Sequence, residues 1–243
     1  GQNFLKNPSI ARRMINYANI ETKDTVLEIG PGLGILTNEL IKESCRLILI
    51  EKDPKLVNYL KSRFEKEDVK IMNGDILDID IPKFNKIVSN IPFNISTKIT
   101  YRILEEDFDL SIMTFQKEYV SRMKATKNND DYSLLSVIIS TFADVEVLFD
   151  ISRHDFYPPP KVDASVIKLK LKEPDFEIKS EEAYIMISKE LFKYRRKMIR
   201  NSLSTAFKIK DTQKIPHQDR RVGNLSPRQI SEIVNYITDE NLL

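Results

Sequence analysis

Short runs of apolar residues alternate with longer amphipathic stretches along the first 170 or so residues of the chain. The apolar runs predict buried strands at residues 25–29, 46–50, 69–72, 86–89 and 110–115. Apolar positions with helical spacing separate most of these runs, as at residues 54–64 and 97–104. This alternation predicts a mostly parallel sheet with helices on both faces, which is the α/β class.

The pattern changes toward the end of the chain. Apolar runs at residues 145–151 and 162–171 flank the segment Tyr157-Pro-Pro-Pro160 and predict an antiparallel edge to the sheet. Beyond this edge only helical spacing is left, with candidate helices at residues 181–192, 195–207 and 227–237. We therefore expect two domains, a ligand-binding sheet domain over residues 1–173 and a small all-α domain over residues 174–243.

A glycine-rich turn follows the first predicted strand and its residue Glu28. Gly30, Gly32 and Gly34 give the spacing G-x-G-x-G, whereas a loop that binds a dinucleotide pyrophosphate requires G-x-G-x-x-G. The backbone N–H groups of such a turn can still face a polar ligand at a helix N-terminus. The sequence thus favours a ligand without phosphates and disfavours an oxidoreductase of the Rossmann type.

Two carboxylates follow the next two predicted strands. Glu51 ends the second strand, where it can accept hydrogen bonds from both hydroxyls of a ribose, and Asp75 ends the third, where it can accept from the amino group of an adenine. Either residue alone would be read as a solvated loop carboxylate. At successive strand ends they instead indicate an adenosine ligand whose amino-acid part lies near the glycine turn, which describes S-adenosylmethionine.

The segment Asn90-Ile91-Pro92-Phe93 combines an amide, a proline-fixed backbone and an aromatic ring. Pro92 biases Ile91 toward extended backbone, so that carbonyl oxygens can be presented beside the Asn90 amide oxygen. Phe93 can lie against the face of a flat base. This arrangement suits a base held by its exocyclic amine, because acceptors near that amine favour positive charge on nitrogen during alkylation. The alternative is an ordinary turn with a core phenylalanine.

Composition excludes several classes of protein. One cysteine and two histidines among 243 residues cannot form a disulfide framework or a Cys/His zinc site, so we expect no metal and a reducing, cytoplasmic environment. The longest apolar stretch, residues 134–143, is shorter than the roughly 18 residues that span a bilayer, so we expect no membrane segment. The chain starts at Gly1 and not at Met, so we expect further residues before it in the natural protein.

A cluster of basic residues lies in the C-terminal part, although the formal net charge is only +2. Its members within eight residues are Lys193, Arg195, Arg196, Lys197 and Arg200. Arg220 and Arg221 precede the last candidate helix. Such residues contact RNA phosphates without reading sequence, and the alternative is a solvated helix face. We expect RNA contact here.

Motifs along nearly the whole chain resemble those of the small-subunit ribosomal RNA adenine dimethyltransferases. The matching segments are Gly1-Gln-Asn-Phe-Leu5, Leu27-Glu-Ile-Gly-Pro-Gly-Leu-Gly34, Asn73-Gly-Asp75, Asn90-Ile-Pro-Phe-Asn-Ile-Ser-Thr97, Gln116-Lys-Glu118, Phe156-Tyr-Pro-Pro-Pro-Lys-Val-Asp163, Arg195-Arg-Lys197 and Asn201-Ser-Leu203. The resemblance implies a Rossmann-like S-adenosylmethionine-dependent methyltransferase sheet with a small all-α C-terminal domain. It also implies N6,N6-dimethylation of two adjacent adenosines near the 3′ end of small-subunit ribosomal RNA, on a pre-ribosomal small subunit, by a monomer.

The resemblance also assigns residues to the site. The implied catalytic residues are Asn90, Pro92 and Phe93. The implied cofactor-binding residues are Asn3, Leu5, Gly30, Gly32, Glu51, Asp75, Ile76 and Asn90. The family more often has tyrosine at the position of Phe93. Phe93 keeps the aromatic face for stacking but lacks the hydroxyl of tyrosine.

Two other functions stay open on the sequence. Antibiotic-resistance methyltransferases that modify an adenine of large-subunit RNA share the cofactor motifs, but residues 116–118 and 157–163 resemble the small-subunit enzymes more. A ribosome-assembly factor that does not depend on turnover could retain every motif.

Overall fold

The computed structural model describes residues 3–43 and 45–242, so the part of the N-terminal motif at Gly1 and Gln2 lies outside the described residues. The chain forms two compact units. The sheet unit comprises residues 1–120 and 145–171, and the helical unit comprises residues 121–144 and 172–243. Residues 121–144 therefore pack with the C-terminal helices. No helix in the described ranges is long and apolar enough to cross a membrane.

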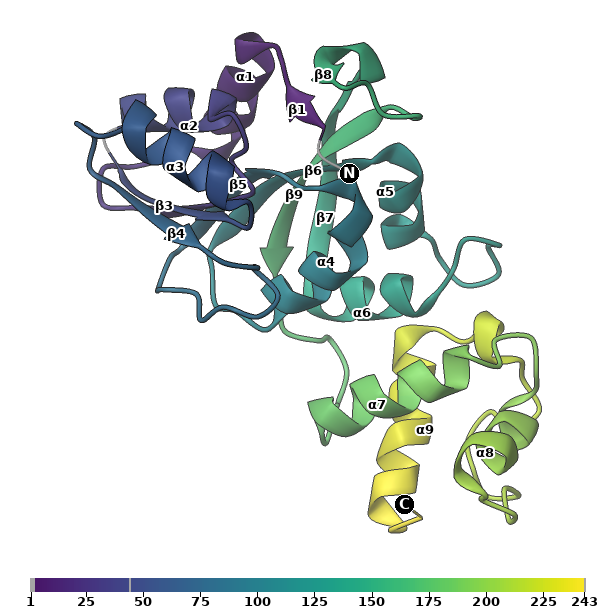
Figure 1. The fold of residues 1–243 in the computed structure, drawn as a ribbon. Coiled ribbons are helices and arrows are strands. Elements are labelled where there is room, and N and C mark those ends of the chain that lie inside the picture. The colour runs from purple at the N-terminus through teal and green to yellow at the C-terminus, as the bar shows by residue number, and fades with distance from the viewer. Residues whose placement is uncertain (1–2, 44, 243) are drawn as a thin grey trace. The chain divides into compact units, whose positions relative to one another are not determined.

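A seven-stranded sheet forms the centre of the sheet unit, in the order β4-β3-β2-β5-β6-β9-β7 (Figure 1). The strands are β2 Thr25–Ile29, β3 Arg46–Glu51, β4 Val69–Asn73, β5 Lys86–Asn90, β6 Leu110–Gln116, β7 Ala143–Ile151 and β9 Ala164–Leu171. The pairings among β2, β3, β4, β5 and β6 are parallel, and β9 runs antiparallel to β6. The predicted parallel sheet with an antiparallel edge is confirmed.

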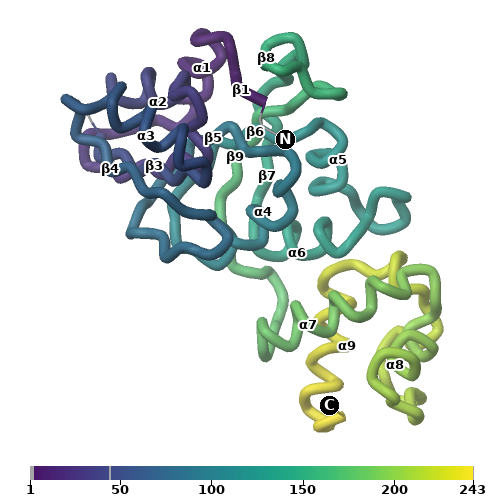
Figure 2. Tube along the Cα trace, in the orientation of Figure 1, coloured from purple at the N-terminus to yellow at the C-terminus, as the bar shows by residue number. Residues whose placement is uncertain are grey.

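Helices cover both faces of this sheet, as the tube trace also shows (Figure 2). They are α1 Pro8–Ala18, α2 Ile35–Leu40 and α3 Pro54–Arg63 on one face and α4 Ser96–Leu104 on the other, with short 3-10 turns η1 Ile41–Glu43, η2 Phe93–Ile95 and η3 Arg153–Asp155. The apolar side of α1, with Ala11, Met14 and Ile15, is buried against the sheet in one hydrophobic cluster. Burial of each larger side chain stabilises the fold by about 1.5–3 kcal/mol.

A small second sheet joins residues 4–5 to residues 156–157. Strand β1 Phe4–Leu5 pairs antiparallel with β8 Phe156–Tyr157, so that Phe4 is opposite Tyr157 and Leu5 is opposite Phe156. The Lys6 backbone N–H extends this pairing by donating to the Asp155 carbonyl at 2.8 Å. The hydrophobic pattern did not predict these two-residue strands.

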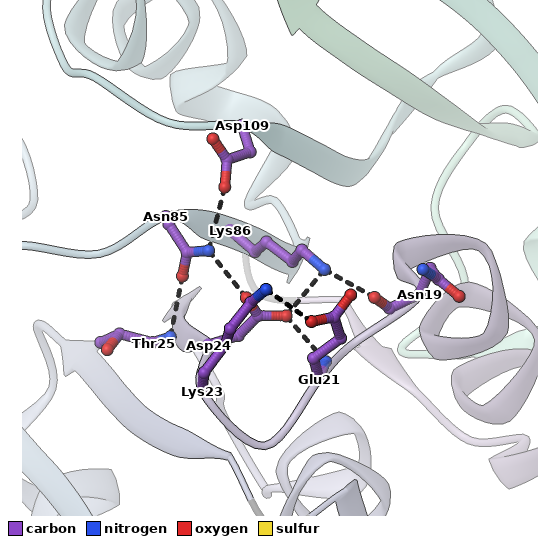
Figure 3. Close-up of polar contacts among 8 residues, drawn as sticks. All are labelled: Asn19, Glu21, Lys23, Asp24, Thr25, Asn85, Lys86 and Asp109. Carbon is purple, nitrogen blue, oxygen red and sulfur yellow. Dashed lines mark hydrogen bonds and ion pairs between the residues drawn. The ribbon is translucent and has the colours of Figure 1, made fainter.

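A buried polar network pins the amino edge of the sheet, where β2 and β5 begin (Figure 3). The Lys86 ammonium lies 2.7 Å from an Asp24 carboxylate oxygen and donates to the Asn19 carbonyl at the end of α1. The Asn85 amide donates to the other Asp24 oxygen and accepts from the Thr25 N–H. Burial would raise the pKa of Asp24, but the hydrogen bonds from Lys86 and Asn85 outweigh it and hold the pKa at about 2.

The helical unit packs around buried aromatic side chains. Its helices are α6 Leu134–Phe142, α7 Glu181–Phe192, α8 Ile199–Phe207 and α9 Pro227–Asp239, together with the 3-10 turn η4 Val222–Asn224 and the end of α5 Lys117–Lys124. Tyr184 is fully buried between α6 and α9, and the Tyr132 hydroxyl donates to the Leu225 carbonyl at 2.8 Å. Ser226 caps α9 in a capping box with Gln229.

The prediction of a helix from residue 195 is wrong, because α8 begins only at Ile199. The carbonyls of Arg195 and Lys197 accept from the N–H groups of Gly223 and Val222, so they are not available for helical hydrogen bonds. Most of the basic cluster thus lies in a turn between α7 and α8.

Candidate functional site

The carboxyl ends of β2, β3, β4 and β5 meet at one edge of the sheet, which is where ligands bind in parallel α/β folds. Two neighbouring cavities lie there, with volumes of about 70 and 230 Å³. They share Gly30, Glu51 and Pro92 in their walls. Because neither alone reaches the roughly 300 Å³ at the lower end of ligand sites, a nucleoside-sized ligand would extend over both.

The structure brings all of the predicted cofactor residues to these cavities. Asn3, Leu5, Gly30, Gly32, Glu51 and Asn90 line the first, and Asp75 and Ile76 line the second. The sequence assigned no role in the site to other wall residues, namely Phe4, Leu33, Ile35 and Leu36 in the first cavity and Asn94 and Ile95 in the second. Phe4 was expected only as part of a sequence motif, because its place in the wall depends on the β1–β8 pair.

The glycine turn is shaped for close approach. Gly30 and Gly32 both adopt left-handed backbone, with φ of 64° and 58°. A β-carbon on Gly32 would lie 2.7 Å from the Phe4 ring, and one on Gly30 would lie 3.3 Å from Pro92 Cγ. Side chains at either position would therefore enter the space between the turn and the walls of the first cavity.

Glu51 is buried and held by the backbone. Its Oε2 accepts from the Gly32 N–H at 3.2 Å and its Oε1 accepts from the Asp53 N–H at 2.9 Å. Each carboxylate oxygen has a second lone pair. The orientation therefore leaves an acceptor on each oxygen for a pair of ligand hydroxyls.

Asp75 has one backbone partner and one solvent-exposed side-chain partner. Its Oδ1 accepts from the Leu77 N–H at 3.1 Å, and its Oδ2 lies 2.7 Å from the Lys52 ammonium, whose side chain is 76% exposed. The hydrogen bond from Lys52, aided by that from Leu77, lowers the pKa of Asp75. The carboxylate is charged at neutral pH and can exchange the exposed lysine for a ligand amino group.

Asn90 carries the least satisfied polar group at this edge. Its side-chain N–H donates to the Asn3 carbonyl at 3.1 Å, which fixes the orientation of the amide. Its Oδ1 is buried without a hydrogen-bond partner, a condition that only Ser188 Oγ shares among the described side chains. An unmet buried acceptor costs about 1–3 kcal/mol. A hydrogen-bond donor on a ligand that reaches this oxygen would recover this energy.

Phe93 follows Asn90 by three residues, begins the 3-10 turn η2 and is partly buried. Its ring meets the fully buried Phe156 ring edge-on, with centroids 5.9 Å apart and planes at 68°. Edge-to-face geometry is a favourable aromatic arrangement and fixes the tilt of the Phe93 ring. Phe156 was expected only as part of a sequence motif, and the structure makes it the support of Phe93.

Glu28 lies below the glycine turn and also lines the first cavity. It is buried, and its Oε2 accepts from the Thr37 hydroxyl at 2.7 Å. Burial raises the pKa of Glu28 to about 8, and the nearby charge of Glu51 adds to the shift. Most Glu28 side chains are therefore protonated at neutral pH.

The basic cluster in the helical unit has divided roles. The Arg195 guanidinium donates to the carbonyls of Asp130 and Asn129 at 2.7 and 3.0 Å, which ties residues 129–130 to the turn. Three further members have side-chain neighbours: Lys193 pairs with Glu190, Arg200 pairs with Asp219, and the Lys197 ammonium lies over the Tyr194 ring. Arg196 and Arg221 line a polar cavity, and neither has a carboxylate partner within the described part of the chain.

Comparison with known proteins adds to this geometry. A family model described as "Ribosomal RNA adenine dimethylase" matches residues 1–239. A "Probable ribosomal RNA small subunit methyltransferase A" from Thermococcus sibiricus is 37% identical, and the alignment covers 100% of this chain and 92% of the relative.

Two solved structures are similar over nearly their whole length. A dimethyladenosine transferase from Plasmodium falciparum has a TM-score of 0.83 at 25% identity, with 98% of each chain covered. The 23S rRNA methyltransferase ErmE has a TM-score of 0.70 at 25% identity, with 97% of this chain and 100% of the other covered.

Proposed function

Because the chain belongs to the ribosomal RNA adenine dimethylase family, we propose that it dimethylates two adjacent adenosines near the 3′ end of small-subunit ribosomal RNA. The chain is an rRNA adenine methyltransferase, and its function is adenine dimethylation in the small subunit. We propose the two adjacent adenosines as its target, together with the residues that act on them. The observation that carries the proposed site is the buried, unpartnered Oδ1 of Asn90 in the wall of the first cavity.

S-adenosylmethionine fits the residues at this edge. Glu51 offers one acceptor on each oxygen for the two ribose hydroxyls, and Asp75 offers a carboxylate for the adenine amino group. The glycine turn and Glu28 border the narrower cavity, where the amino-acid end would lie. When bound, this cofactor supplies an electrophilic methyl group.

Asn90 and Phe93 would act on the target base. Asn90 Oδ1 accepts one N–H of the adenine amino group, which stabilises positive charge as it develops on that nitrogen. The Asn3 carbonyl keeps the amide from turning its N–H toward the base. Phe93 stacks on the base, which must be turned out of its RNA strand to reach the pocket. In this scheme the proton leaves to water and the transfer is direct.

We assign RNA contact to the helical unit and methyl transfer to the sheet unit. Arg196 and Arg221 supply free guanidinium groups for phosphates, whereas Arg195 holds the turn that presents them. The partner in this proposal is a pre-ribosomal small subunit, on which the enzyme acts as a cytoplasmic monomer. The relative from Thermococcus sibiricus, which is named for small-subunit ribosomal RNA and is 37% identical, supports a small-subunit target.

The role of Asn90 is tested by an Asn90→Ala variant, with the exposed Asn58→Ala on α3 as the control. Loss of the acceptor should lower the rate of methyl transfer by roughly 100- to 1000-fold, the usual loss for one positioned group that stabilises developing charge. Cofactor affinity should change little. Mass spectrometry of labelled methyl groups on RNA in small subunits measures the rate and counts the methyls per adenosine.

Full turnover by Asn90→Ala would contradict the assigned role of this residue. Absence of dimethyladenosine with the wild-type enzyme, on naked RNA, free subunits and assembly intermediates alike, would contradict the proposed target.

A further inference from the structure

Tyr157 is exposed to an extent unusual for an aromatic side chain. At 67% it exceeds every other large hydrophobic side chain in the described part of the molecule. It follows Phe156 on β8, and successive side chains on a strand point to opposite faces. Phe156 accordingly lies fully buried against Phe93, and the Tyr157 ring points outward.

The backbone of Tyr157 is joined to the proposed catalytic amide. Tyr157 pairs with Phe4, whose ring covers Gly32 in the first cavity. The carbonyl of the next residue, Pro158, accepts from the Asn3 side chain at 2.7 Å, and the Asn3 backbone carbonyl fixes Asn90. The backbone that carries the exposed ring is therefore linked to the wall of the first cavity through residues 3 and 4.

The backbone that carries this ring is held in place. Tyr157 lies in the β1–β8 pair, and the three prolines at residues 158–160 follow it. Proline fixes φ, so the backbone on this side has little freedom to lose when a ligand binds. Only the two side-chain torsions of the tyrosine need to be ordered.

Cations flank the ring in sequence. Arg153 donates to the Lys161 carbonyl at 3.2 Å, and its backbone N–H donates to Asp163, so the two ends of this loop are tied together. Both Arg153 and Lys161 are exposed, and neither side chain forms an ion pair among the described residues. An exposed aromatic ring between unpaired cations is typical of surfaces that bind single-stranded nucleic acid.

We propose that Tyr157 stacks on the nucleobase that adjoins the target adenine in the RNA strand. Turning the adenine out of its strand removes the stacking partner of this neighbour. A rigid ring at the pocket margin replaces that partner and holds the strand in the opened form. The inference rests on the proposed function, because it needs an adenine in RNA as the substrate.

Kinetics of substituted enzymes test the stacking. Tyr157→Leu suits a strand but lacks the aromatic face, and it should raise the KM for RNA by roughly 5- to 150-fold, the range for loss of one stacked base. Its kcat at saturating RNA should stay close to that of the wild type, since the ring does not contact the reacting atoms. Tyr157→Phe should keep the wild-type KM. Tyr17→Ala, at an exposed tyrosine on α1, is the control.

Fluorescence gives a second readout that does not depend on turnover. The chain has no tryptophan, so Tyr157→Trp introduces a single tryptophan, which can be excited apart from the tyrosines. A short single-stranded RNA that contains two adjacent adenosines should quench its emission in the presence of S-adenosylhomocysteine. Tyr17→Trp should show no quenching with the same RNA.

The outcomes separate the two proposals. If the wild type forms dimethyladenosine but Tyr157→Leu keeps its KM and Tyr157→Trp is not quenched, the stacking role is overturned and the proposed function stands. If Tyr157→Leu also loses affinity for S-adenosylhomocysteine by calorimetry, the fluorescence of Tyr157→Trp decides. If the wild type forms no dimethyladenosine on any RNA substrate, the proposed function itself fails.

Discussion

The two edges of the main sheet place polar groups under opposite conditions. At the amino edge, the buried Asp24 and Lys86 satisfy each other and bond to neighbouring backbone and amide groups (Figure 3). At the carboxyl edge, where β2 and β5 end, burial raises the pKa of Glu28, and Asn90 Oδ1 has no hydrogen-bond partner. The two edges are the opposite ends of the same parallel strands.

The difference separates stability from function along the length of each strand. Satisfied buried charges hold β2, β5 and the end of α1 together where no ligand binds. Unmet or neutralised polar groups cost stability where the ligand can later satisfy them. The amino edge thus supplies the rigidity on which an energetically unfavourable carboxyl edge depends.

The largest effect is expected at the amino edge, from Lys86→Met. This change leaves the Asp24 carboxylate buried and without its cation, which should lower the free energy of unfolding by about 3–5 kcal/mol. Urea unfolding followed by circular dichroism measures it. The control Lys23→Met removes an ammonium that is 79% exposed and should change stability by less than about 0.5 kcal/mol. Equal losses in the two variants would contradict the assignment of stability to this network.

A smaller effect should appear at the carboxyl edge as a pH dependence. Since the pKa of Glu28 is raised in the folded state, its contribution to stability is full below about pH 4.5 and is lost as the pH rises toward 8. Glu28→Gln replaces the carboxyl by a neutral group of the same shape, and its unfolding free energy should stay flat over this range. Urea unfolding at pH 5 and pH 8 measures the difference, and parallel curves for the two proteins would refute the buried neutral state.

Asp24 should give a pH dependence of opposite sign and somewhat smaller size. Its pKa is lowered in the folded state, so its contribution is full above about pH 3.8 and is lost as the pH falls toward 2. The contribution amounts to about 2 kcal/mol. The stabilities of the wild type and of Asp24→Asn in acid should therefore converge as the pH falls to about 2. A stability gap that stays constant from pH 5 to pH 2 would show that Asp24 does not titrate as its contacts require.

The parts of the site that the sequence predicted are those that lie on strands with strong hydrophobic patterns. Glu51, Asp75 and Asn90 each come at or directly after the end of such a strand, and parallel pairing then brings them to one edge without further information. The fold class follows from the same patterns.

The parts that the sequence did not predict depend on contacts between distant segments. Phe4 reaches Gly32 only because residues 4–5 pair with residues 156–157, and two-residue strands leave no periodicity to detect. The late start of α8 has a similar cause, since hydrogen bonds to residues 222–223 override the helical propensity of residues 195–198. A local hydrophobic pattern does not predict pairing between segments that are distant in the sequence.

The hydrogen bond that orients Asn90 has a consequence for the synthesis of the protein. The side chain of Asn3 is held by the Pro158 carbonyl, which is translated 155 residues after Asn3. At roughly 5–20 residues per second, the two meet no sooner than about 8 to 30 seconds after Asn3 is made. A nascent chain that has already formed β2 to β6 would still lack an oriented Asn90 amide, so the enzyme becomes competent only when residues 3–5 and 156–158 join.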